Sequence, residues 1–307
     1  MVKRVKFTDI PVIKAMARAP PLPPLPDLGL FAQVKQFPAI RKTLTTFLGK
    51  SLRKLPSDVR SRFKKVFWEA VDLKETDFET LSTLKAMFDP YRVTAKFVPT
   101  EARSDSRIKD LERWLKELIK ENAVTDYLDV GCSEANITKV LGEYLQLGVG
   151  HVYGCDVRLP AQNVREPNIV FRPNLPNKIP YEEETFDLVT AMMALHHFTD
   201  PKTMLKEIYR VLRPGGTLII REHDSRTKGF ALFLDMVHAL YAVVINEEES
   251  VEEFLSTFES FYHPKEVWSK NYIEPAGFTF AGLVYPKMRG RQKGMDLYRS
   301  YYARYRK

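Results

Sequence analysis

The sequence predicts an α/β protein with a mainly parallel sheet covered by helices on both faces and preceded by a helical N-terminal region. From about Asp105 onward, short apolar runs typical of buried strands alternate with stretches of helical periodicity. Before that point, apolar residues recur at helical spacing. Alternation of strands and helices at these lengths is typical of parallel sheets, because the helices connect one strand to the next.

Composition and charge are those of a folded protein. The 307 residues are 44% hydrophobic and 28% charged, which supports a buried core. The formal net charge is +8 and the pI is about 9.2. A positive excess favours an anionic partner such as RNA, DNA or a membrane surface, although many proteins with this charge have no such partner.

The cysteines and the N-terminus indicate a reducing, intracellular setting. Cys132 and Cys155 are the only cysteines and have no metal-ligand spacing, so we predict neither a disulfide framework nor a metal site. No apolar run has the length of a signal peptide or of a transmembrane helix, which needs roughly 20 residues. We therefore expect a soluble, cytoplasmic protein.

The chain divides by composition into three regions. Residues 1–36 are basic and proline-rich, and proline favours extended polyproline II, so we expect an arm or linker. Residues 37–104 are predicted to be a helical accessory region. Its apolar stripes are Leu48, Leu52 and Leu55, then Phe63, Val66, Phe67 and Ala70, then Phe78, Leu81, Leu84 and Phe88. Dense Lys and Arg over 41–65 indicate either a solvated helix surface or a phosphate-binding face.

Residues 105–307 form the third region, which carries the α/β rhythm. A helix stripe over 108–119 precedes a short apolar strand that begins near Tyr127. Further strands are predicted at 151–156, 168–172, 186–191 and 216–221, and helices at 134–146 and 201–212.

Two strand ends carry the first functional signals. Gly131 follows the strand at Tyr127 and lets the backbone approach a ligand without a Cβ in the way. Asp156 ends the next strand, where a carboxylate accepts hydrogen bonds from the two ribose hydroxyls of an adenosine ligand. In doubly wound sheets, ligands bind at this carboxyl edge of the strands.

Four segments in order resemble class I S-adenosylmethionine-dependent methyltransferases, and most closely the broad branch that includes quinone-biosynthesis enzymes. The segments are DVGC at 129–132, GCD at 154–156, FDLVTAMMALHHF at 186–198 and RVLRPGGTLIIREHD at 210–224. The resemblance covers about residues 124–224. It implies a Rossmann-like seven-stranded sheet whose last two strands, from 277–285 and 295–305, add one antiparallel strand.

The resemblance also implies S-adenosylmethionine as cofactor and assigns residues to it. Small residues in the turn after the first strand replace later glycines of the family, at Ser133 and Ala135. By motif position, the methionine end of the cofactor is lined by Asp129, Gly131, Cys132 and Ser133, and its sulfonium lies beside Met192. Its ribose is held by Asp156, and its adenine ring is contacted by Val157 and Asn174.

The candidate catalytic residues follow the fourth and fifth strands. Methyl transfer mainly requires alignment of the acceptor with the methyl group, and sometimes removal of a proton. Histidine has a pKa suited to that proton transfer. We favour Glu222, His223 and His197 over the neighbouring His196 and Asp224.

The segment 229–262 interrupts the core after the fifth strand and has a strong apolar helix face. Its position fits a cover over the substrate, an interaction surface or plain core packing.

Three functions remain open from the sequence. An RNA acceptor, such as a cap guanine, is favoured by the basic helices over 41–65 and by the basic, tyrosine-rich segment 287–307. A small-molecule acceptor is favoured by the motif resemblance. The third alternative is a catalytically inactive methyltransferase-like structural or interaction protein.

Overall fold

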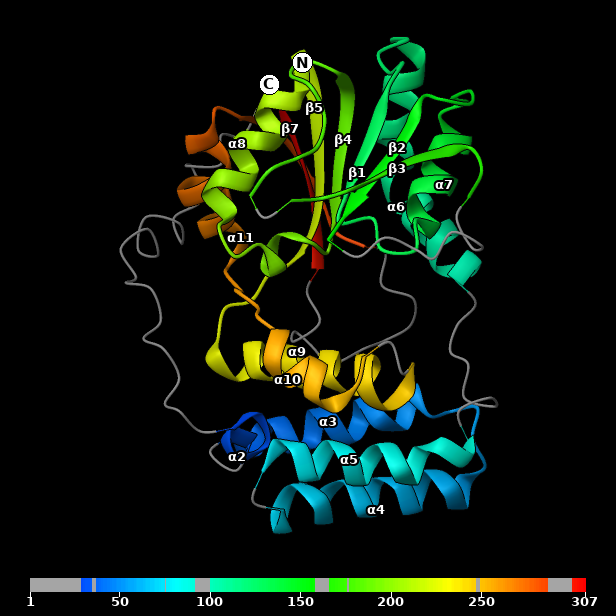
Figure 1. The fold of residues 1–307 in the computed structure, drawn as a ribbon, viewed down its shortest axis with the longest axis vertical. Helices are drawn as coiled ribbons and strands as arrows, with labels where there is room; N and C mark the ends of the chain where they lie inside the picture. Colours follow the sequence, from blue (N-terminus) through cyan, green and yellow to red (C-terminus); the bar gives the residue numbers. More distant parts are fainter. Residues whose placement is uncertain are drawn as a thin grey trace, which may run out of the picture.

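The computed structural model describes residues 29–34, 37–74, 76–91, 100–157, 166–175, 177–246, 249–286 and 300–307. These residues form two lobes, one with the sheet and its flanking helices and one with helices only (Figure 1). Residues 1–28 and 35–36 of the predicted arm lie outside the described residues, as do residues 287–299 of the basic C-terminal segment.

The sheet has seven strands in the order β3-β2-β1-β4-β5-β7-β6. Its first five members run parallel, and β7 lies antiparallel between β5 and β6. The fold class predicted from the sequence is thereby confirmed. The strands are β1 Tyr127–Val130, β2 Val152–Asp156, β3 Ile169–Pro173, β4 Phe186–Met192, β5 Leu212–His223, β6 Thr279–Val284 and β7 Ser300–Arg306.

Helices cover both faces of the sheet because successive strand residues point to opposite sides. Tyr127 packs with helices α6 (Thr100–Lys120) and α7 (Asn136–Tyr144). Leu128, the next residue, belongs to the opposite cluster with α8 (Pro201–Val211). Short helical segments complete this lobe: η4 Leu195–His197, α11 Lys265–Val267, η6 Trp268–Ile273 and η7 Glu274–Ala276.

Strand β7 buries its tyrosines on both faces of the sheet. Tyr302 packs on the side of α6, whereas Tyr301 and Tyr305 pack on the side of α8. All three are almost fully buried. They are therefore core residues and do not form an exposed aromatic surface on which an RNA strand would stack.

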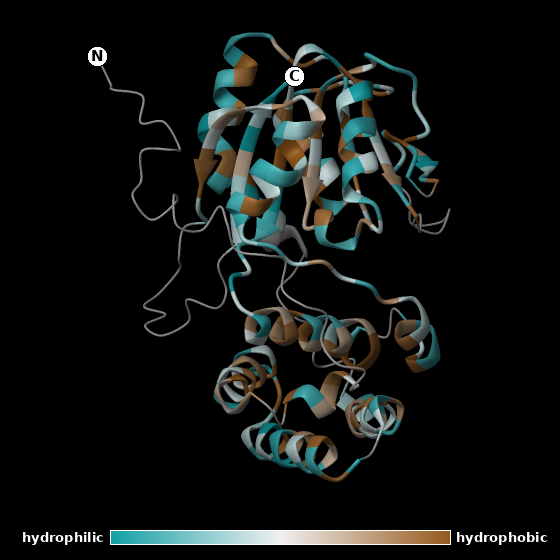
Figure 2. Cartoon of the chain, turned by 90° about the vertical axis from the view of Figure 1, so that its left-hand side faces the viewer, coloured by the Kyte–Doolittle hydropathy of each residue, from teal (hydrophilic) through white to brown (hydrophobic). Residues whose placement is uncertain are grey.

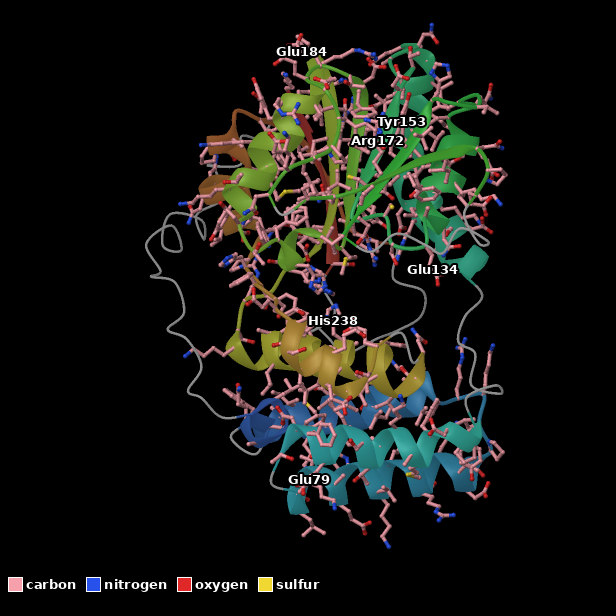
Figure 3. All side chains as sticks on the ribbon, in the orientation of Figure 1. Glu79, Glu134, Tyr153, Arg172, Glu184 and His238 are labelled. Atoms are coloured by element: carbon pink, nitrogen blue, oxygen red, sulfur yellow. The ribbon has the colours of Figure 1, made fainter. Side chains whose placement is uncertain are left out.

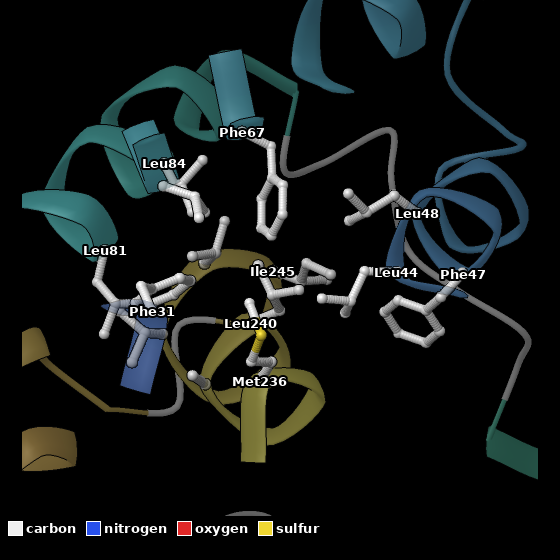
Figure 4. Packing of buried hydrophobic residues seen from close by; sticks show 14 of the residues in the cluster. Phe31, Leu44, Phe47, Leu48, Phe67, Leu81, Leu84, Met236, Leu240 and Ile245 are labelled. Carbon is white, nitrogen blue, oxygen red and sulfur yellow. The ribbon is translucent and has the colours of Figure 1, made fainter. Parts of the chain in front are cut away.

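The helical lobe joins two parts of the chain that are distant in sequence. Its buried residues come from the N-terminal helices and from the segment between β5 and β6, and they form one hydrophobic cluster (Figure 4). Of the predicted stripe residues, Val66 is only half-buried and Phe78 is 44% exposed. The elements are α2 Leu30–Val34, α3 Pro38–Ser51, α4 Ser57–Leu73, α5 Asp77–Phe88, η2 Asp89–Tyr91, α9 Lys228–Ala239, η5 Leu240–Ile245 and α10 Val251–Thr257.

Helix α2 corrects the prediction of an unpacked arm over residues 1–36. Phe31 and Val34 are buried in the core of the helical lobe. The Asp77 carboxylate accepts hydrogen bonds from the backbone N–H groups of Leu30, at 2.5 Å, and Phe31, at 2.9 Å. A side chain distant in sequence thus satisfies N–H groups that a helix start leaves unpaired, which lets five residues after the prolines form a packed turn.

Helices α9 and α10 lie against the end of the sheet lobe where the parallel strands terminate (Figure 1). Among the described residues, Lys228–Ile245 is long and apolar enough to cross a bilayer by length and composition, but 56% of it is buried inside the protein. In both lobes, hydrophobic and hydrophilic residues alternate along the helices (Figure 2). The apolar residues of 229–245 therefore build the core of the helical lobe, and the same segment also borders the carboxyl edge of the sheet.

Candidate cofactor and acceptor site

The turn after β1 lies at the switch point of the sheet, because β1 pairs with β2 on one side and with β4 on the other. Gly131 has φ +74°, and its N–H donates a hydrogen bond of 2.8 Å to the Cys155 carbonyl. A Cβ at this position would lie 2.6 Å from the Ala194 Cβ. Both the left-handed backbone and the close approach of the β4 loop thus require glycine.

The two small residues that replace glycines in this turn also have left-handed backbones. Ser133 has φ +47° and Ala135 has φ +57°. The Ser133 N–H donates to Oδ2 of Asp156 at 2.8 Å, which ties the turn to the end of β2. A non-glycine residue in this region stores about 1–2 kcal/mol of strain, and such strain is typical of ligand-binding turns.

Asp129 supports the turn from inside the sheet. It is fully buried, and its carboxylate accepts hydrogen bonds of 2.6 Å from the hydroxyls of Thr138 and Thr190. Burial raises the pKa of Asp129 to about 6, although the two threonine hydrogen bonds oppose the shift. The predicted contact with the methionine end of the cofactor is therefore indirect, because neither oxygen reaches the surface.

The ends of β2 and β3 present the groups predicted for the adenosine part. Asp156 is half-buried, Val157 is 72% exposed, and the Asn174 N–H donates to the Asp156 carbonyl at 2.8 Å. The side-chain oxygen of Asn174 is buried and has no hydrogen-bond partner among the described residues. A lone acceptor beside an acidic strand end fits the amine of an adenine ring whose ribose is held by Asp156.

The remaining two predicted cofactor residues are buried around the same turn. Met192 ends β4 and is 7% exposed, and Cys132 is 4% exposed. Burial raises the pKa of the Cys132 thiol far above its usual range, so it is a neutral packing residue. The set from Gly131 to Met192 thus converges on one end of the sheet and fits S-adenosylmethionine.

At the carboxyl ends of β4 and β5, the buried carboxylate of Glu222 accepts hydrogen bonds from His196 and His223. Glu222 and His196 are both fully buried, and Oε1 of Glu222 lies 2.7 Å from Nδ1 of His196. The His223 N–H also donates to Oε1 of Glu222, at 2.6 Å. Glu222 is therefore a positioning residue, because its carboxylate is enclosed by groups of the protein itself.

His197 is the exposed member of the predicted catalytic set. Its Nδ1 lies 3.2 Å from the Glu259 carbonyl, and its ring centroid lies 4.2 Å from that of His196. Desolvation by the surrounding protein, with a smaller effect of His196, lowers the pKa of His197 to about 4. The imidazole is therefore neutral at pH 7 and accepts a hydrogen bond more readily than it removes a proton.

His223 is a buried neutral side chain, whereas Asp224 holds a loop at this edge. Burial lowers the pKa of His223 well below its usual value, and its Nδ1 has no partner among the described residues. Asp224 is buried and accepts hydrogen bonds from the Lys265 N–H at 3.1 Å and from Arg226. Asp224 thus fixes the segment that begins helix α11.

The structure adds residues that the sequence did not single out. His238 of α9 and Tyr262 approach the His196 ring, with centroid distances of 5.4 Å and 5.1 Å. Figure 3 shows His238 on the side of α9 that faces the sheet lobe. The sequence signal was the apolar segment 229–262 after the fifth strand, which fitted a cover, an interaction surface or core packing equally and did not identify the inward-facing side chains.

Comparison with known proteins agrees with this geometry. A sequence profile of the methyltransferase domain family matches residues 128–220. The chain is 26% identical over 159 residues to the ubiquinone/menaquinone biosynthesis C-methyltransferase of Haemophilus ducreyi, covering 48% of this chain and 60% of that protein. It is 25% identical over 256 residues to the mitochondrial ubiquinone biosynthesis O-methyltransferase of Rattus norvegicus, covering 75% of this chain and 68% of that protein.

A third relative is more similar over a shorter stretch. The demethylmenaquinone methyltransferase of a Geobacillus species is 33% identical over 127 residues, which cover 38% of this chain and 53% of that protein. The chain thus spans between about half and two thirds of these relatives' lengths. The profile match runs from β1 into β5 and includes the turn at Gly131 and the carboxylate of Asp156. Sequence and geometry together thus identify a methyltransferase domain in this chain, with the seven-stranded sheet order described above, that is similar to the quinone-biosynthesis methyltransferases.

Proposed function

We propose that this chain transfers the methyl group of S-adenosylmethionine to a small-molecule acceptor. The observation that carries the proposal is the adenosine-type site at the switch point of the sheet. There, Asp156 is tied to the strained turn at Ser133, and the buried oxygen of Asn174 has no partner within the part of the chain that the structure describes. The three relatives reported above are methyltransferases by name.

The bound cofactor would supply an activated methyl group on a sulfonium. Asp156 and Asn174 would hold its adenosine part, so that a nucleophilic carbon or oxygen of the acceptor could take the methyl group while sulfur kept the electron pair of the broken carbon–sulfur bond and the acceptor's proton passed to solvent. The protein aligns the two reactants, since positioning supplies much of the rate for such a displacement. Met192 ends the strand beside the turn, so the acceptor would approach at this edge of the sheet.

A small molecule is preferred over RNA as the acceptor. The three relatives reported above are named for quinone biosynthesis, and none is named for RNA. Tyr301, Tyr302 and Tyr305 are core residues, which weakens the argument for RNA from the aromatic residues of 287–307. We therefore propose an aromatic acceptor of the quinone-precursor type, and RNA binding by the basic residues of 41–65 remains an untested prediction.

The first test is calorimetric titration of S-adenosylmethionine into wild type, Asp156→Asn and Asp156→Ala. The charged hydrogen bonds of a carboxylate contribute about 1.5–3 kcal/mol, so we expect Asp156→Ala to weaken binding roughly 10- to 100-fold. Asp156→Asn should lose less, because its amide oxygen still accepts one hydrogen bond. Glu143→Ala, an exposed acidic residue of α7, is the matched control and should bind as wild type does.

The second test is methyl transfer from labelled S-adenosylmethionine to two classes of quinone precursor, with acceptor carbon or with acceptor hydroxyl, and to RNA. Transfer to a quinone precursor supports the proposal, whereas transfer to RNA alone overturns the assigned acceptor. Cofactor binding without transfer to any of these would favour the inactive interaction protein. Absence of cofactor binding in wild type would overturn the proposal as a whole.

A further inference from the structure

We propose that His196, His197 and His238 bind one transition-metal ion of the Zn²⁺ type between the two lobes. His196 and His197 belong to η4, directly after β4, whereas His238 belongs to α9 of the helical lobe. Figure 3 shows His238 in the space between α9 and the edge of the sheet. The site goes beyond methyl transfer, because the cofactor residues described above do not include these three side chains.

The three side chains are close enough to share one ion. One potential ligand atom from each lies within 4.8 Å of the other two. The ring centroids of His197 and His238 are 5.1 Å apart. Tetrahedral Zn²⁺ with Zn–N bonds of about 2.0–2.1 Å separates its ligand nitrogens by about 3.3–3.4 Å. Small side-chain rotations therefore suffice to close the site around an ion.

Hydrogen bonds fix the tautomer of His197 and His238. Nδ1 of His197 lies 3.2 Å from the Glu259 carbonyl, and Nδ1 of His238 lies 2.9 Å from the Leu234 carbonyl and 3.0 Å from the Tyr262 hydroxyl, which can accept from the same N–H. A carbonyl oxygen only accepts, so both Nδ1 atoms carry the hydrogen. Nε2 of each neutral ring consequently keeps its lone pair, which is the form in which histidine ligates a metal.

His196 gives the strongest indication of a ligand. Its Nδ1 pairs with the Glu222 carboxylate at 2.7 Å, and its Nε2 is buried without a partner among the described residues. A buried nitrogen without a partner is costly unless something binds it. A carboxylate on the far nitrogen of a histidine is also the usual support of a metal ligand, since it sets the tautomer and raises the basicity of the ring.

The composition of the site selects the class of metal. Three neutral imidazoles suit Zn²⁺ and similar first-row ions rather than Mg²⁺ or Ca²⁺, which prefer oxygen ligands. Three protein ligands leave a fourth tetrahedral position open for water or an acceptor oxygen. The exposure of His197 provides access to that position.

A second grouping, of His196, Glu222 and His223, is a weaker candidate. Oε1 of Glu222 already accepts hydrogen bonds from His196 Nδ1 and from the His223 N–H. Metal binding by that carboxylate would compete with both. The grouping with His238 leaves these hydrogen bonds in place, so we assign the ion to it.

The experiment uses full-length protein without a histidine tag, stripped with a chelator and titrated with Zn²⁺ against a chromophoric competitor. We expect one ion per chain in wild type and loss of stoichiometric binding in His238→Ala and in His197→Ala. His151→Ala is the control, because His151 pairs with Asp126 away from the cluster and should leave binding unchanged. Glu222→Gln should weaken Zn²⁺ binding roughly 10- to 100-fold, as expected for a residue behind a metal ligand.

Two further readouts keep the test decisive. Titration of S-adenosylmethionine and circular dichroism establish that each variant is folded, and they also separate failure of the metal site from failure of the methyltransferase proposal. Saturating Zn²⁺ should raise the melting temperature of wild type and leave that of His238→Ala unchanged. The proposal is overturned if wild type binds no stoichiometric Zn²⁺, or if folded His238→Ala binds it as tightly as wild type does.

Discussion

The carboxylate of Glu222 lies 2.7 Å from Nδ1 of His196, and neither side chain is exposed to solvent. Glu222 lies near the carboxyl end of β5 and His196 lies in η4 after β4, so the pair joins the end of β5 to the loop after β4. Because the backbone N–H groups of His196 and His223 also point at this carboxylate, one side chain satisfies three donors.

Removal of that carboxylate should be strongly destabilising. In Glu222→Ala the three donors lose their acceptor inside the protein, so we expect a loss of about 3–5 kcal/mol in the free energy of unfolding. Glu222→Gln retains one acceptor oxygen, and we expect a smaller loss of about 1–3 kcal/mol. Urea denaturation measures both, and equal losses in the two variants would contradict the role of Glu222 as an acceptor for several donors.

Substitutions at two positions in the turn after β1 should change the stability of the fold in opposite directions. Gly131→Ala places a Cβ 2.6 Å from the Ala194 Cβ at φ +74°, and we expect about 2–4 kcal/mol of destabilisation from overpacking and backbone strain. Ser133→Gly relieves a left-handed backbone at an exposed residue and should stabilise the fold by up to about 1 kcal/mol. Chemical denaturation of both variants tests the sign, and a stabilised Gly131→Ala would show that the turn adopts another conformation.

Asp129 predicts a pH dependence of stability. Burial raises its folded pKa to about 6, above the value of about 3.9 in an unfolded chain, so the folded state binds the proton more tightly. The resulting stabilisation is fully present below pH 3.9 and is lost as the pH rises through 6. Relative to wild type, Asp129→Asn should gain about 2 kcal/mol in the free energy of unfolding between pH 4 and pH 7, because one pKa unit corresponds to about 1.4 kcal/mol and the unfolded carboxyl is already half ionised at pH 4.

Asp129→Asn also changes stability by an amount that does not depend on pH, and this amount has to be separated from the effect of titration. Replacement of the carboxylate by an amide alters the hydrogen bonds from Thr138 and Thr190 at every pH, so only the change with pH reports on titration. Denaturation curves of both proteins across this range measure the change. A difference between them that stays constant with pH would show that Asp129 has an ordinary pKa.

The sequence predicted the cofactor half of the site because its signals are local. Gly131 and Asp156 each end a short apolar strand, and parallel strands place their carboxyl ends at one edge. The hairpin that supplies β6 and β7 followed from the family resemblance. Asp129 shows where the assignment of roles by motif position fails. The sequence does not distinguish a buried carboxylate that supports the turn from one that faces a ligand.

The acceptor half could not be predicted because it depends on contacts between distant segments. His238 lies on the opposite lobe from His196, and nothing in its local sequence indicates which side of α9 faces the sheet. The same holds for α2, whose first N–H groups bind Asp77 from 46 and 47 residues away. Amphipathic periodicity predicts that a face is buried, but not which part of the chain covers it.

The helical lobe has a hydrophobic core of its own, and this predicts that the two lobes unfold separately. The cluster that contains Phe47 and Phe233 includes no residue of the sheet among those the structure describes. The Phe47 ring meets that of Phe233 edge to face, at a centroid distance of 5.9 Å. Phe233→Ala should therefore destabilise the helical lobe by about 3–5 kcal/mol, the usual cost of removing a buried aromatic ring.

Phe233→Ala should affect cofactor binding less than methyl transfer, because the cofactor residues lie in the sheet lobe. The turn at Gly131 and the carboxylate of Asp156 belong to the sheet lobe, so Phe233→Ala should bind S-adenosylmethionine with nearly the affinity of wild type. Methyl transfer and Zn²⁺ binding should decline together on warming, because α9 supplies His238. Leu255→Ala, at a position of α10 that is 39% exposed, is the control and should change stability by less than about 0.5 kcal/mol. Parallel loss of cofactor binding and helical structure in Phe233→Ala would instead show that the two lobes unfold as one cooperative unit.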